Sequence, residues 1–385
     1  MAINRSVKKL IFTVIIAALS ISLFPAQANA EIATQVSVNS IGLLTDSPPF
    51  ILNDYTYVPF RAIAESLGCD VGYDDATQTV TITGHGITLS LTIDSRQAVV
   101  NGKPVTMAAP AVVVNDRTMV PVRFVCETFK SEVRWQEGYE SEYGVSDNKV
   151  MIYSEFPSTV KPLGVGVSSR CFSYYSALGQ NPYYDYEQSV SYDYIIPQFS
   201  GMGDASYQAV LNAQMLAKYL NADTEARENE REQRADAQGL DESDVYYYTY
   251  SNELSYRVSG VRGNILEITL ESYEYLGGAH GMPFIYTYNI DTARSKTLQL
   301  GDLFTNASYK QTLINKMNAI RLKGGEDMEY VEEVVELPPD NSFYFTDDAL
   351  IIYYEPYELA SYARGFVEFS VPLSELSGIL RDEYK

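Results

Sequence analysis

The sequence has few of the residues on which most catalytic and metal sites depend. Its 385 residues include 2 histidines, 3 cysteines and 1 tryptophan. Three cysteines cannot build a disulfide framework for a chain of this length. Two histidines, with no H-E-x-x-H spacing and no G-x-S-x-G turn, support neither a zinc protease nor a serine hydrolase. We therefore expect no catalytic residues, no bound metal and no cofactor.

Positive charge is also scarce. There are 28 basic side chains against 50 acidic ones, which gives a formal net charge of −22 at pH 7. A chain of this charge repels phosphate backbones, so nucleic acid is not an expected partner. It attracts cations and basic proteins at long range.

Long hydrophobic runs are confined to the N-terminal segment 1–30. Arg5, Lys8 and Lys9 precede an apolar run at 10–24, and Ala-Asn-Ala closes the segment at 28–30. This order is typical of a secretory signal peptide, and the run is short for a membrane span. We expect a secreted, extracellular chain with no membrane span after cleavage, associated with the cell wall through what it binds. Retention of the segment as an anchor is the alternative.

The three cysteines stand far apart in the sequence. Cys69 follows the end of an expected helix, Cys126 lies inside another, and Cys171 is isolated. Buried free thiols are the preferred interpretation of Cys69 and Cys126. A bridge between these two remains an alternative.

What the sequence does contain is an internal repeat. Residues 53–61 (NDYTYVPFR) return with three substitutions as 115–123 (NDRTMVPVR). Each residue of the first copy has its counterpart at the same offset as Asn115 from Asn53. Self-similarity of this kind indicates a duplicated folding unit. Pro59 and Pro121 suit the first turn of a helix, and Gly68 suits the end of the first one. Each repeat therefore predicts a strand, a turn, a short helix and further strands.

These residues resemble the copper amine oxidase N-terminal-like domain, also called a stalk domain. The similarity rests on 115–123, on Asn-Gly-Lys at 101–103 and on Val-Gly-Tyr-Asp at 71–74, while Tyr55 departs from the usual arginine. The resemblance covers 31–156 and implies a small α+β spacer or adhesive module. It implies no amine oxidase activity.

The composition changes after an expected Pro/Gly/Ser-leaning linker at 157–170. Of 32 tyrosines, 26 follow Cys171. Apolar spacing predicts one helix from Asp204 onward and another over 309–322, with the charged tail at 223–244 in solvent or frayed. Alternating patterns predict strands around 189–199, 246–258, 265–275, 284–291, 342–345, 349–354 and 366–371. The expected fold class is α+β, with the tandem repeats followed by an antiparallel sheet and two main helices.

This second region, 171–385, resembles the extracellular domain pair of the lysozyme-sensing anti-sigma-V factor. The same pair accompanies the catalytic domain of a peptidoglycan deacetylase. The similarity rests on five segments in the family's order: 277–281 (GGAHG), 297–304 (TLQLGDLF), 343–350 (FYFTDDAL), 354–358 (YEPYE) and 371–376 (VPLSEL). It implies a fold, and a cell-wall component or lysozyme as ligand.

Six residues are candidates for ligand binding. His280 lies in a glycine-rich turn where backbone can approach a ligand, and tyrosine rings suit sugar stacking and protein interfaces. The candidates are His280, Gly277, Gly278, Tyr275, Tyr354 and Tyr357. The alternatives are a hairpin locked by His280 and tyrosines that fill the core.

Carboxylates allow one enzymatic alternative. Glu271, Glu274 and Glu355 stand near these motifs, and a glycosidase needs only two such groups. Acids are abundant throughout the chain, so their presence does not discriminate. The acidic run at 225–232 lacks the spacing of a calcium loop and is expected to be a solvated helix face.

We expect a secreted, non-catalytic protein of the bacterial cell envelope that binds a wall glycan or a basic protein such as lysozyme. The alternatives are a carboxylate-dependent wall hydrolase, a deacetylase accessory protein, and a purely structural spacer.

Overall fold

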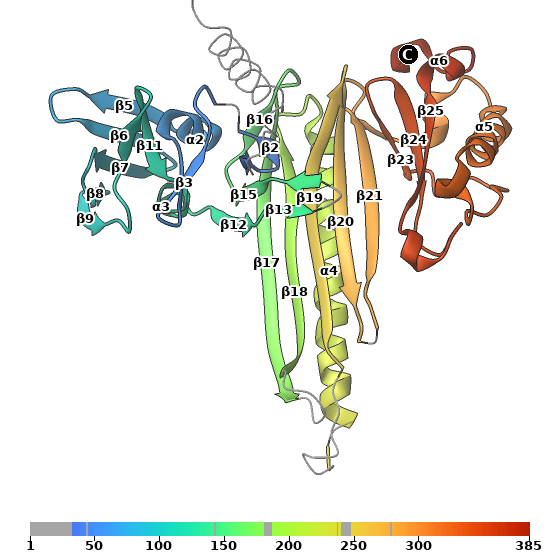
Figure 1. The fold of residues 1–385 in the computed structure, drawn as a ribbon, viewed down its shortest axis with the longest axis horizontal. Helices are drawn as coiled ribbons and strands as arrows, with labels where there is room; N and C mark the ends of the chain where they lie inside the picture. The colour runs from blue at the N-terminus through green and yellow to red at the C-terminus, as the bar shows by residue number, and fades with distance from the viewer. Residues whose placement is uncertain are drawn as a thin grey trace, which may run out of the picture.

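The computed structural model describes residues 33–43, 45–141, 144–180, 187–236, 238–239, 248–277 and 279–385. The expected signal segment and Gly278 lie outside these residues. The described chain has the expected α+β architecture, arranged as three parts in a row (Figure 1). No helix in the described ranges combines the length and apolar character needed to cross a membrane.

The first part is the duplicated module, and the constant offset between its two copies governs its elements. β3 (Phe50–Leu52), β4 (Tyr55–Pro59), α2 (Phe60–Ser66) and β5 (Asp70–Asp74) recur in the second repeat. Their counterparts are β10 (Val112–Val114), β11 (Arg117–Pro121), α3 (Val122–Thr128) and β12 (Glu132–Gln136). Pro59 and Pro121 directly precede the helices as expected.

The two repeats are related by a local two-fold axis. β4 pairs antiparallel with its own duplicate β11, with Val58 opposite Val120, Tyr57 opposite Pro121 and Pro59 opposite Met119. Because Val58 and Val120 are equivalent positions, the axis passes between them. One apolar cluster, which includes Val58, Val120 and both helices, fills the centre. The repeats therefore form a single module.

Four sheets build this module among the described residues, in the orders β10-β11-β4-β3, β5-β6-β7-β8-β9, β12-β15-β1-β2 and β13-β14. The first strands of repeat 1 thus join the last strands of repeat 2. The remaining bounds are β1 (Thr34–Val38), β2 (Ile41–Gly42), β6 (Thr79–Gly84), β7 (Ile87–Thr92), β8 (Gln97–Val100), β9 (Lys103–Thr106), β13 (Tyr139–Ser141), β14 (Gly144–Ser146) and β15 (Asn148–Tyr153).

The second part is a seven-stranded sheet in the order β16-β17-β18-β19-β20-β21-β22. All neighbours are antiparallel except β18 and β19. The long helix α4 (Ala205–Asp236) packs on this sheet through Leu211, Met215, Ala222 and Ala226. The strands are β16 (Ser158–Val160), β17 (Val165–Gln180), β18 (Glu187–Ser200), β19 (Tyr250–Arg262), β20 (Ile265–Tyr275), β21 (Met282–Asp291) and β22 (Lys296–Leu298).

The third part is the C-terminal module. Its sheet has the order β23-β24-β25, and α5 (Tyr309–Lys323) packs into the same core through Leu313 and Met317. The other bounds are β23 (Phe343–Phe345), β24 (Ala349–Tyr354), β25 (Val367–Pro372) and α6 (Leu373–Leu376), with 3₁₀ turns η3 (Leu300–Leu303), η4 (Gly325–Met328), η5 (Tyr362–Arg364) and η6 (Asp382–Tyr384).

The expected linker at 157–170 is wrong. β16 and the start of β17 occupy it, as the edge strand of the seven-stranded sheet and the strand next to it. Asn39 of the duplicated module is fully buried beside them: its amide nitrogen donates to Phe156 O, and its amide oxygen accepts from Ser154 N and Ser169 Oγ. Since buried amides must satisfy their hydrogen bonds, this network joins the two parts firmly.

The expected solvated tail of α4 is also corrected. Ala222 and Ala226 are buried, and Glu230 accepts hydrogen bonds from Ser176 Oγ (2.6 Å) and the Tyr174 hydroxyl of β17. Glu230 of the acidic run therefore bonds to the sheet, whereas Glu225, Glu228 and Glu232 are exposed as expected. The cysteine prediction is confirmed, since Cys69 and Cys126 are buried free thiols, and Cys171 is free and exposed.

Candidate functional site

The glycine-rich turn connects β20 to β21 at one end of the seven-stranded sheet. Gly277 has φ +83°, a left-handed conformation that favours glycine. A Cβ on Gly281 would lie 2.6 Å from Glu274 O and 2.6 Å from the Tyr273 ring. Only glycine fits at this second position, because the hairpin closes tightly against Tyr273.

His280 projects from this turn onto the C-terminal module. Its ring stacks on Tyr362 at a centroid distance of 3.7 Å and an interplanar angle of 16°. The hydroxyl of Tyr357 lies 3.4 Å from His280 Nε2, and the Tyr357 and Tyr362 centroids are 5.8 Å apart. His280, Tyr357 and Tyr362 form a compact group of three rings, which we call the aromatic cluster.

Two tyrosine hydroxyls tie the cluster to the backbone of the turn. Tyr362 donates to Gly281 O at 2.8 Å, and Gly281 N donates to the Tyr273 hydroxyl at 3.0 Å. The rings are therefore held in place, while Tyr357 remains 59% exposed and Tyr273 40% exposed. A rigid, partly exposed group of rings can stack against a flat apolar ligand face with little loss of conformational entropy.

The sequence candidates divide between this cluster and the core. His280, Gly277 and Tyr357 lie at the turn or against it, and Tyr275 is half-buried at the end of β20. Gly278 is outside the described residues. The structure corrects Tyr354: its ring is 4% exposed and its hydroxyl donates to Glu336 O at 2.6 Å. Tyr354 fills the core because it points to the inner face of β24, whose residues are all buried.

Two members of the site escaped the sequence analysis. Tyr273 could have been found, because it lies two residues before Tyr275 and strand periodicity puts both on one face. Tyr362 gave no such signal. It meets His280 across 82 positions of sequence, and only the packing of η5 against the turn brings the two rings together.

The carboxylates near the turn occupy different environments. Glu271 pairs with Arg257 at 2.7 Å on the surface. Burial, followed by the nearby Glu225, raises the pKa of Glu274, and burial together with Glu358 raises the pKa of Glu355. Lys218 Nζ lies 3.7 Å from the Tyr286 ring centroid, and burial lowers the pKa of this lysine. Among the described residues, no three His, Cys, Asp or Glu side chains are grouped to hold a metal.

Comparison with protein families assigns a class to each part. Residues 37–143 match the copper amine oxidase N-terminal domain, 185–283 match the deacetylase PdaC model, and 301–374 match a family described as a protein of unknown function, DUF3298. The domain composition expected from the motifs is confirmed. His280 lies in the second matched segment, and Tyr357 and Tyr362 lie in the third. The aromatic cluster therefore combines side chains from two segments that match different family models.

A particular relative is the peptidoglycan-N-acetylmuramic acid deacetylase PdaC of Bacillus subtilis (strain 168). It is 25% identical over 167 residues, which are 40% of this chain and 35% of that protein. The chain thus matches about a third of the relative's length.

Two solved structures of the DUF3298 family are also similar. The Bacteroides fragilis NCTC 9343 member has a TM-score of 0.45 and 20% identity, and covers 56% of this chain and 94% of its own. The Pseudomonas aeruginosa PAO1 member has a TM-score of 0.38 and 19% identity, and covers 57% of this chain and 96% of its own.

Proposed function

We propose that this chain is an exported, non-catalytic protein of the bacterial cell envelope that binds the glycan of peptidoglycan through the aromatic cluster. The observation that carries the proposal is the fixed group of His280, Tyr357 and Tyr362 at the surface. A sugar ring has one apolar face that stacks on such rings and hydroxyl groups at its edge. The relative's name, which specifies peptidoglycan, supports this class of ligand.

The chemistry around the cluster suits a neutral, hydroxyl-rich ligand. Tyr357 offers a hydroxyl beside its exposed ring, and His280 offers ring nitrogens that accept or donate according to tautomer. The carboxyl groups of Glu274 and Glu355 on neighbouring elements can accept hydrogen bonds from sugar hydroxyls. The abundance of acidic residues disfavours an anionic ligand here.

The test is retention of the purified chain on insoluble peptidoglycan. Tyr357→Ala should reduce the association constant about threefold to tenfold, the scale expected for one lost aromatic contact. Tyr330→Ala is the matched control, since Tyr330 is an 80% exposed tyrosine of the same module and is not a member of the aromatic cluster. Equal retention of the two variants would remove the aromatic cluster from the proposal.

His280→Ala separates binding from folding at the same cluster. We expect its loss of affinity to exceed any loss in thermal stability, because the imidazole is exposed and stacks on one face only. Parallel losses of affinity and stability would show that His280 acts as a hairpin lock.

Lysozyme is the second candidate ligand, and the formal net charge of −22 favours it. A specific complex should survive salt that abolishes the binding of an unrelated basic protein, since screening removes non-specific attraction first. Association that disappears for both proteins at the same salt concentration would reject lysozyme.

The enzymatic alternatives make a different prediction. A wall hydrolase would release reducing ends from purified peptidoglycan, and a deacetylase would release acetate. We expect neither product, with or without added divalent metal. Multiple turnovers by homogeneous protein would overturn the non-catalytic proposal.

A further inference from the structure

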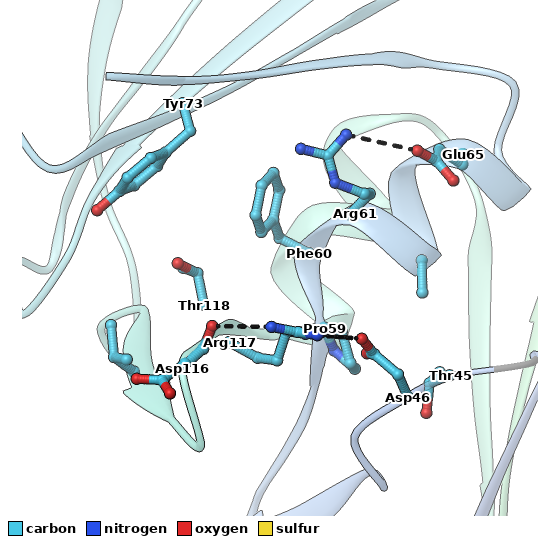
Figure 2. A pocket seen from close by; sticks show the side chains of 12 residues that line it. Thr45, Asp46, Pro59, Phe60, Arg61, Glu65, Tyr73, Asp116, Arg117 and Thr118 are labelled. Carbon is cyan, nitrogen blue, oxygen red and sulfur yellow. Dashed lines mark hydrogen bonds and ion pairs between the residues drawn. The ribbon is translucent and has the colours of Figure 1, made fainter. Parts of the chain in front are cut away.

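A groove of about 690 Å³ opens on the duplicated module, remote from the aromatic cluster in the sequence. Figure 2 shows its lining: Tyr73 stands across the opening from the Arg61–Glu65 pair of α2, and Arg117 reaches Asp46 at the lower edge. The groove thus combines the helix and the following strand of repeat 1 with the Asp116–Thr118 turn of repeat 2.

A second groove, of about 430 Å³, is the two-fold equivalent of the first. Of the twelve residues that line the first groove, ten have their counterpart in the other repeat among the residues that line the second. Trp135 replaces Tyr73, the Arg123–Glu127 pair replaces Arg61–Glu65, and the turn now comes from repeat 1. Tyr73 is 43% exposed and Trp135 is 42% exposed, so each groove presents one half-exposed ring.

The arginines of both grooves are already paired. Arg61 and Arg123 lie 3.6 Å and 3.3 Å from the glutamates one turn along their helices. Arg117 pairs with Asp46, and Arg134 of the second groove lies 2.7 Å from Asp193 and 2.6 Å from Glu132. An anionic ligand would have to break one of these pairs. A neutral ligand that accepts from arginine and donates to carboxylate can add to them.

Several equivalent positions differ between the grooves, and one pair of them exchanges an ion pair for uncharged side chains. The first has Arg117 bound to Asp46, whereas the second has Tyr55 and Ala108 at the equivalent positions. Exchange of an ion pair for a ring and a methyl group leaves the second groove with two half-exposed rings, Tyr55 (37%) and Trp135. Two exposed rings that line one groove offer two stacking surfaces for a sugar.

We propose that the duplicated module carries two sites, related by the local two-fold axis, for a neutral oligosaccharide of N-acetylated hexosamine. The Tyr55–Trp135 groove binds this ligand more tightly than the other groove. The rings stack on sugar faces, and the Arg–Glu pairs bond hydroxyl and acetamido groups. This inference is independent of the aromatic cluster, because no residue is shared between them. The chain would therefore attach to a glycan strand at more than one point.

Trp135 is the chain's single tryptophan, so its emission reports on the second groove alone. Titration of the full chain with N-acetylchitotetraose should give a saturable change in emission. Maltotetraose, which lacks acetamido groups, should give none. Absence of a saturable change with N-acetylchitotetraose at millimolar concentration would overturn the proposal.

Exchange of residues between the grooves provides the matched variants. Tyr55→Arg with Ala108→Asp gives the second groove the ion-pair residues of the first, and we expect about tenfold weaker binding. Arg117→Tyr with Asp46→Ala should strengthen the first groove, which calorimetry would record as a second site of similar affinity. An affinity of the Trp135 site that the first exchange leaves unchanged would contradict the assigned ring pair.

Two further variants are needed. One tests the Tyr55 ring without the risk that new charges disturb the fold, and the other separates the grooves from glycan binding at the aromatic cluster. Tyr55→Ala tests the same ring without new charges, with Tyr330→Ala as control. Tyr357→Ala should leave the Trp135 titration unchanged while it weakens retention on peptidoglycan. Loss of the Trp135 response in Tyr357→Ala would refute two separate sites.

Discussion

The duplicated module and the seven-stranded sheet with its helix use carboxylates differently. In the module, Glu65 and Glu127 sit at equivalent positions, each more than half exposed and paired with an arginine one turn away. On the sheet, Glu230 and Glu267 are mostly covered and bonded to hydroxyl or backbone groups. Surface pairs contribute little to stability, while buried carboxylates respond strongly to their surroundings. The dependence of stability on pH should therefore reside in the sheet.

The joint between the two regions should give the largest effect. Asn39→Ala removes the amide that bonds Phe156 O, Ser154 N and Ser169 Oγ, and leaves these groups buried without that partner. We expect a loss of about 3 kcal/mol in the free energy of unfolding, measured by urea denaturation.

Asn53→Ala is the control for the joint. Asn39 and Asn53 have the same left-handed φ of 49°, but Asn53 is an exposed turn residue of the module. The difference between the variants isolates the buried network from backbone strain. Equal losses would show that the joint contributes nothing beyond its conformation.

Glu230→Gln should have the next largest effect. Hydrogen bonds from Ser176 and Tyr174, with the nearby Arg234, lower the pKa of Glu230 to about 2. Because the folded pKa lies below that of the unfolded chain, the charge stabilises the fold fully above about pH 5 and this contribution is lost as pH falls towards 2. We expect a cost of about 1 kcal/mol at pH 7 that shrinks on acidification. Glu228→Gln, exposed on the same helix, should show no such convergence.

Glu267→Gln tests the opposite sign. Burial raises the pKa of Glu267, while its carboxylate accepts from Phe345 N at 2.9 Å. The folded state holds the proton more tightly than the unfolded state, so stability falls as pH rises from about 4.5 through the folded pKa. Glutamine keeps the acceptor without the charge and should gain about 1 kcal/mol at pH 7. A variant that is less stable than the parent at pH 7 and equally stable at pH 4 would contradict this assignment. The control is Glu271→Gln, because Glu271 is exposed on the same strand.

The smallest effects should come from the module's surface pairs. Glu65→Gln and Glu127→Gln should each cost no more than about 0.5 kcal/mol, equally in both copies and less at high salt. A clearly larger cost in one copy, measured by thermal unfolding, would show that the repeats do not share their energetics.

Local patterns were sufficient for much of this fold. The internal repeat, the Val-Pro helix starts and the alternating strands were predicted because each depends on neighbours in sequence. The linker was wrong because 157–170 lacks a strong strand pattern, and its strands form only through the pairing of β16 with β17 and of β17 with β18. The tail of α4 was misread at Glu230, whose partners lie on β17, which is distant in the sequence.

The candidate site shows the same division. His280 stood out by its glycine neighbours, but Tyr362 and the aromatic cluster arise from packing between two modules. Tyr354 was a candidate for ligand binding because periodicity assigns residues to the two faces of a strand without showing that both faces of β24 are covered.

The sequence by itself determined the duplication, the acidic charge and the α+β class, since composition and short-range spacing carry this information. Tertiary structure decided which strands pair across repeats, which tyrosines remain exposed, and that two grooves face outward around the axis between Val58 and Val120. These features depend on contacts between distant residues, whose free energies are realised only when the cores of all three parts close.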